Sequence, residues 1–107
     1  MNKLIIDTLS QTGLPVAYQT YRGDEDDFIR FFYLPNVDYE ADDDEIYTTR
    51  YVQVDIFTPG NPKSYAKQVK DLMKEQGFKK NFEHEVYDED EKTFHYIFRF
   101  YKIEEVK

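Results

Sequence analysis

The order of patterns in the second half of the chain constrains the fold more than any other feature of the sequence. Residues 51–57 alternate between apolar and polar or aromatic side chains, as a strand does. Residues 62–76 then carry apolar side chains at helical spacing, and a glycine follows directly. Residues 80–103 hold two more alternating segments around an acidic turn, which is typical of an antiparallel hairpin. A strand, a helix and a hairpin in this order predict one compact α+β unit.

The first half of the chain adds a helix and further strands to this unit. We expect a short helix over 3–12, a short strand over 16–21, an aromatic strand over 28–33 and a long strand over 47–57. The order is then α-β-β-β-α-β-β in a single α+β domain, 1–107. It predicts a mainly antiparallel sheet of four to five strands with both helices packed on one face.

Length and composition limit what the domain contains. A chain of 107 residues is long enough for one hydrophobic core and too short for two. Ten Tyr and nine Phe supply much of the apolar surface, and the absence of Cys excludes disulfides and thiolate metal sites. The N-terminus lacks the apolar run of a signal peptide, and no segment approaches the roughly 20 apolar residues of a membrane span. We therefore expect a protein that does not use a membrane.

The negative charge of the chain is concentrated in one region. The formal net charge is −8, and residues 24–45 alone hold ten acidic residues against one basic residue. The rest of the chain is close to neutral. A field of this sign repels the nucleic-acid backbone, so we expect no specific binding of nucleic acid. The acidic region is either a solvated loop or a surface that faces a basic protein partner.

The sequence contains no convincing catalytic site. His84 and His95 fall on adjacent strands of the predicted hairpin, where they would be ordinary sheet residues or the start of a metal site that lacks further ligands. The acidic runs lack the spaced ligands and central glycine of an EF-hand, and no glycine-rich phosphate loop is present. We expect no catalytic residue, no cofactor and no bound metal.

Aromatic side chains are predicted on both faces of the sheet. Two small helices cover one face, so the second face would expose Tyr and Phe, and exposed aromatic patches on small domains usually mark a protein interface. The alternative is that Tyr simply occupies an open sheet face. The predicted interface residues are Tyr51, Phe57, Tyr87 and Tyr101.

Several of these segments together resemble a known family. The succession of Leu14-Pro15, the strand at 51–57, the helix at 62–76 closed by Gly77-Phe78, and a hairpin that ends in 94–103 is similar to the tail completion or tail terminator proteins of siphophages and prophages. The resemblance spans nearly the whole chain and rests on element order.

The resemblance implies a non-enzymatic structural role. Such proteins form a ring that caps the tail tube and joins it to the head connector. The states expected here are a hexamer on the virion and, as an alternative in isolation, a monomer. The expected partners are copies of itself, the tail tube protein and the head-connector protein, in the host cytoplasm during assembly and then in the virion. The acidic loop at 38–46, which we expect to be mobile, would line the ring channel or meet a partner through four carboxylates. These residues are Asp42, Asp43, Asp44 and Glu45.

Two other functions stay open from the sequence. The first is an acidic inhibitor or immunity-type protein, which would dock negative loops onto a basic nucleic-acid enzyme. The second is a small enzyme or ligand-binding domain.

Overall fold

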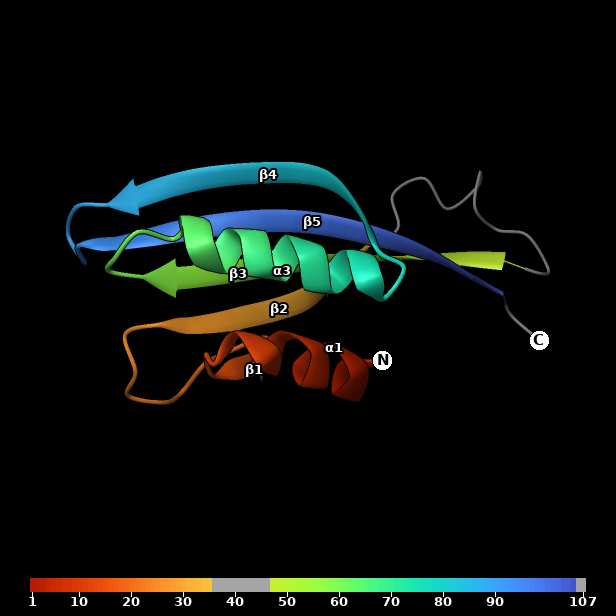
Figure 1. The fold of residues 1–107 in the computed structure, drawn as a ribbon, viewed down its shortest axis with the longest axis horizontal. Helices are drawn as coiled ribbons and strands as arrows, with labels where there is room; N and C mark the ends of the chain where they lie inside the picture. The colour runs from red at the N-terminus through yellow and green to blue at the C-terminus, as the bar shows by residue number, and fades with distance from the viewer. Residues whose placement is uncertain (36–46, 106–107) are drawn as a thin grey trace.

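A computed structural model describes residues 1–35 and 47–105 of the chain. These residues form two α-helices, a short 3-10 helix and a five-stranded sheet (Figure 1). In chain order the elements are α1 (Asn2–Leu9), η1 (Ser10–Thr12), β1 (Val16–Tyr18), β2 (Phe28–Leu34), β3 (Tyr47–Thr58), α3 (Lys63–Glu75), β4 (Lys79–Asp88) and β5 (Thr93–Glu105). The predicted α+β class is therefore confirmed.

The sheet is mixed, with strand order β1-β2-β3-β5-β4. The pairings β2–β3, β3–β5 and β4–β5 are antiparallel, as expected. β1 differs, because it pairs with β2 in parallel. The parallel pairing continues past both ends of β1, where Ile29 donates its N–H to the carbonyl of Pro15 and Gln19 donates its N–H to the carbonyl of Phe31, each at 2.8 Å.

Both helices pack on one face of the sheet, as Figure 1 shows for α3 lying across β3 and β5. Side chains from α1, such as Ile5 and Leu9, and from α3, such as Val69 and Met73, share one core with the sheet. Alternate strand residues supply the other half of this core. They are Ile29, Phe31, Val52, Val54, Ile56, Phe98 and Phe100.

The ends of both predicted helices follow the chemistry of their sequence. Asn61 accepts the N–H of Lys63 on its side-chain oxygen at 3.0 Å, which satisfies one free donor at the start of α3. Gly77 adopts φ +91°, and the N–H of Phe78 returns to the carbonyl of Met73 at 3.0 Å. This backbone geometry is the Schellman ending of a helix, which favours glycine. Gly13 ends η1 in the same left-handed region, with φ +87°.

Two details differ from the sequence-based expectation. The first helix is split, because its last turn tightens into the 3-10 helix η1 before the chain reaches β1. β1 stops at Tyr18, short of the predicted end at residue 21, because Gln19 takes a positive φ of 68° that no strand continues through. The predicted acidic loop at 38–46 lies outside the described residues.

Candidate interaction face

The second face of the sheet, opposite the helices, is built from the alternate residues of β2, β3, β5 and β4. Because paired residues of antiparallel strands point to the same side, the strand registers define which side chains share it. We call this surface the open face. It comprises Phe28, Arg30, Phe32, Leu34, Thr49, Tyr51, Gln53, Asp55, Phe57, Lys79, Phe82, His84, Val86, Asp88, Thr93, His95, Ile97, Arg99, Tyr101 and Ile103.

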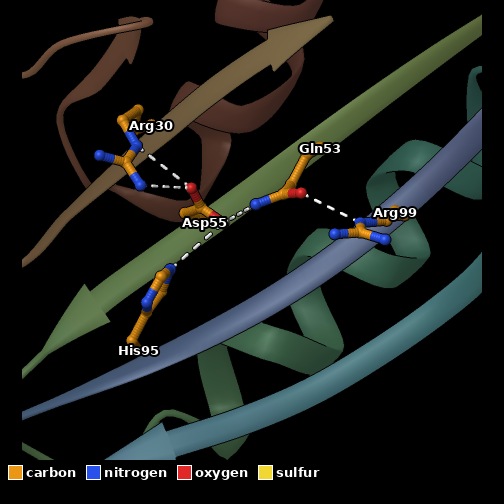
Figure 2. Close-up of polar contacts among 5 residues, drawn as sticks. All are labelled: Arg30, Gln53, Asp55, His95 and Arg99. Atoms are coloured by element: carbon orange, nitrogen blue, oxygen red, sulfur yellow. Dashed lines mark hydrogen bonds and ion pairs between the residues drawn. The ribbon is translucent and has the colours of Figure 1, made fainter. Parts of the chain in front are cut away.

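A fully buried carboxylate lies at the centre of the open face. The side chain of Asp55 is 0% exposed, although α1 and α3, the α-helices of residues 1–35 and 47–105, both pack on the opposite face. Arg30 covers it from β2, with Nε at 3.1 Å and Nη2 at 2.7 Å from the same oxygen, Oδ2. Gln53 donates from its Nε2 to the other oxygen, Oδ1, at 2.9 Å. Side chains from neighbouring positions of the sheet therefore contact both oxygens of the carboxylate (Figure 2).

His95 reaches the same carboxylate from β5. Its Nε2 is buried and lies 3.2 Å from Asp55 Oδ1, an ion-pair distance without the alignment of a hydrogen bond. Burial raises the pKa of Asp55, but contacts from His95, Arg30 and Gln53 outweigh it and hold the pKa below its ordinary value. Asp55 is thus a carboxylate in the folded protein at neutral pH.

The polar contacts continue across the sheet to Arg99. The Oε1 atom of Gln53 accepts a hydrogen bond from Nε of Arg99 at 3.0 Å. Gln53 thus connects Arg99 to Asp55, which in turn pairs with Arg30 (Figure 2). The Arg99 guanidinium then lies over the ring of Phe82 on β4, 4.8 Å from its centre. The network therefore connects β2, β3, β5 and β4.

Aromatic rings stack at one end of the open face. The ring of Phe57 lies between Phe28, with centroids 4.8 Å apart, and His95, with centroids 4.2 Å apart. Tyr21 extends the stack beyond Phe28, and the Arg30 guanidinium lies 5.1 Å from the centre of the Phe57 ring. These contacts fix the side chains of this end in one arrangement.

The structure brings together three of the four predicted interface residues. Tyr51, Phe57 and Tyr101 lie half-buried on the open face, and the rings of Tyr51 and Tyr101 lie 6.2 Å apart. Tyr87 is exposed but belongs to the helix-bearing face, where it pairs with Phe94. The prediction that all four share one face is therefore wrong for Tyr87. The register between β4 and β5 decides which face of the sheet Tyr87 occupies. This register includes an irregularity between Lys80 and Phe82.

The positions of the two histidines and the lengths of the helices bear on metal and membrane binding. His84 pairs with Ile97 and Val86 pairs with His95, so the two histidines share a face, and Glu83 and Glu85 lie on the other. Within residues 1–35 and 47–105, no group of three His, Cys, Asp or Glu side chains is arranged to hold a metal ion. No helix among those same residues has the length and apolar character needed to cross a membrane. The predicted acidic loop residues, Asp42, Asp43, Asp44 and Glu45, lie outside the described residues.

Sequence reasoning missed the charged network. The alternation of β3 places Gln53 and Asp55 on the open face, but it does not reveal that Asp55 is buried there. Two features of the sequence pointed to this network. Asp55 is an acid between apolar neighbours on one strand, and Arg30 is a lone base in the middle of the aromatic strand. The register that pairs Arg30 with Asp55 turns these features into a contact.

Comparisons with known proteins support the fold and go no further. No protein-family model matches the chain, and no curated protein matches it in sequence. Thirteen chains of solved structures match it. One of them, a protein that bears only a sequence identifier as its name, superposes with a TM-score of 0.62 at 13% identity, over 99% of this chain and 90% of its own. At this identity the similarity defines a shared fold.

Proposed function

We propose that this chain is a non-enzymatic structural protein of a siphophage or prophage tail, which forms a ring that completes the tail tube and joins it to the head connector. The proposal rests on the resemblance in element order and on the open face. That face is the observation that carries it, because it lies opposite α1 and α3 and bears Tyr, Phe and Arg, which are enriched in protein interfaces.

The order of the open face supports a contact surface. The network around Asp55 and the stack around Phe57 already hold their side chains in one arrangement. A partner that binds such a surface orders few additional side chains, which reduces the entropic cost of association. Tyr51 and Tyr101 lie beside the network and are proposed as contacts with a neighbouring protein.

The hairpin supplies a second proposed contact region. β4 is the outermost strand at one side of the sheet (Figure 1), and nine of its ten residues are exposed. An edge strand of ten residues offers backbone N–H and C=O groups to a strand of another chain. Its charged side chains, including Lys79, Glu85 and Asp88, oppose random pairing and would select a partner.

Deletion of the gene from the phage or prophage that encodes it tests this function. A missing terminator leaves tube growth unchecked, so we expect tails of irregular, excessive length that do not join to heads, as seen by electron microscopy. Expression of the wild-type chain in trans should restore normal tails. Normal tails and normal titre in the deletion strain would contradict the proposal.

The acidic inhibitor remains the second candidate, favoured by one observation. Carboxylates from the loop before β2 and from the β4–β5 turn converge at one end of the open face. An inhibitor would bind a basic nuclease one to one as a monomer, whereas a ring subunit binds tail tubes. Titration against both targets separates the two functions.

A further inference from the structure

An acidic hollow lies at one end of the open face. Its volume is about 350 Å³. Aromatic side chains from the stack, with Val86 and Thr93, line it together with carboxylates from two different turns. The carboxylates are Glu25, Asp26, Asp88 and Glu91, and the aromatic residues are Phe28, Phe57 and His95.

A basic hollow lies at the other end of β4, between α3 and the start of that strand. Its volume is about 280 Å³. Phe78 and Phe100 line it, and four lysines from the end of α3 and the start of β4 surround them. These are Lys70, Lys74, Lys79 and Lys80, of which Lys80 also pairs with Glu83.

The two hollows are too far apart to meet within one chain. β4 begins at the basic hollow and ends at the acidic hollow, so its ten residues separate them by about 30 Å. Figure 1 shows the loop before β2 and the β4–β5 turn at the same end of the sheet, and the α3–β4 connection at the other. Two oppositely charged surfaces at opposite ends of one chain can meet only between copies, in a head-to-tail arrangement.

We propose that the acidic hollow of one copy binds the lysines of the basic hollow of the next copy. The lysine stems would lie against Phe28 and Phe57, and their ammonium groups among the carboxylates. Four acidic side chains then face four basic ones. Repeated head to tail, the contact generates a closed ring or an open filament. The inference rests on the proposed ring and specifies the surfaces that would hold it together.

Charge reversal in two separate chains tests the contact. One variant, Asp26→Lys/Glu91→Lys, makes the acidic hollow basic and spares Asp88, whose side chain accepts the N–H groups of Asp90 and Glu91 in the turn. The other variant, Lys70→Glu/Lys79→Glu, makes the basic hollow acidic. A matched control, Lys63→Glu/Lys67→Glu, reverses two exposed lysines of α3 that lie outside the hollow.

Sedimentation velocity at low salt gives the readout. We expect wild type and the control to self-associate, and each hollow variant alone to associate at least about tenfold more weakly. An equal mixture of the two hollow variants should associate like wild type, because each reversed surface then meets a complementary one. Salt should weaken every association.

The contrary results are distinct. Wild type that remains monomeric at all concentrations, or a mixture that fails to regain association while both variants are folded by circular dichroism, overturns the contact. Tails that are normal in length with either hollow variant would overturn it too, and would leave the proposed function standing. Head-to-tail association without any effect of gene deletion on tails would instead refute the function.

Discussion

The guanidinium of Arg30 donates two hydrogen bonds to a single oxygen of Asp55, from Nη2 at 2.7 Å and from Nε at 3.1 Å. The arginine side chain is 33% exposed, and the carboxylate is 0% exposed. The Arg30 guanidinium thus pairs with a buried charge on the face opposite α1 and α3. The pair joins β2 to β3 and makes the open face a fixed surface.

Removal of Arg30 should destabilise the protein. Arg30→Met keeps much of the side-chain volume but leaves the buried carboxylate of Asp55 without its main partner, and we expect a loss of about 2–4 kcal/mol in the free energy of unfolding. Urea denaturation measures it. The double variant Arg30→Met/Asp55→Leu should recover most of the loss, because an apolar pair replaces the ion pair. A double variant as unstable as the single one would contradict this interpretation.

Asp55 should also shape the stability of the protein in acid. Its pKa is lower in the folded state than the ordinary 3.8, so the unfolded chain takes up the proton first as the pH falls. The stabilisation is therefore complete above that ordinary value and is lost as the pH falls through the folded pKa. Thermal unfolding between pH 2 and pH 6 should show a smaller acid-induced loss for Asp55→Asn than for wild type. If stability fell equally with pH in Asp55→Asn and in wild type, Asp55 would have no part in the acid-induced loss.

Tyr96 makes a corresponding prediction at high pH. Burial, together with the hydrogen bond that its hydroxyl donates to Glu83, raises the pKa of Tyr96 to about 12 from an ordinary 10.0. The neutral phenol is favoured in the folded state, so its contribution is present below pH 10 and is lost as the pH rises toward 12. Tyr96→Phe should flatten the alkaline limb of the stability profile. Absorbance titration of the phenolate in wild type checks the raised pKa directly.

The end of α3 tests the backbone account of the fold. Gly77 has φ +91°, which an L side chain adopts only with strain, so Gly77→Ala should cost about 1 kcal/mol. The added methyl group would lie 3.4 Å from Cε of Lys102, an ordinary contact, so the cost should come from the backbone alone. Gly60→Ala is the control, since Gly60 has ordinary φ and only one distant neighbour. Equal stability of the two variants would contradict the argument.

The helices and strands could be predicted because the spacing of apolar residues within a single segment largely decides whether it is helix or strand. The helical spacing that ends at Gly77 and the alternation of Val52, Val54 and Ile56 each depend on a single segment, and α3 and β3 follow them. The face of the sheet on which Tyr87 lies and the burial of Asp55 depend instead on how different strands pair. A shift of one residue in register moves a side chain to the other face, and no local signal fixes that register here.

The parallel pairing of β1 with β2 has the same origin. The strand propensity of residues 16–18 does not indicate whether β1 runs parallel or antiparallel to β2. That direction depends on where the chain enters β1 after α1 and η1. The charged network was equally hidden, because Arg30 and His95 reach Asp55 from strands far apart in sequence. These are tertiary contacts that only the assembled sheet defines.

The most direct test of the proposed role is the binding of the purified chain to tail tubes of the phage or prophage that encodes it. Co-sedimentation and negative-stain microscopy would compare wild type with Tyr51→Ser/Tyr101→Ser, which alters the open face, and with Tyr87→Ser, which alters an exposed tyrosine on the other face. We predict ring-shaped caps at tube ends for wild type and Tyr87→Ser, and none for the folded double variant. Tubes left uncapped by wild type, or capped equally by all three chains, would contradict the account.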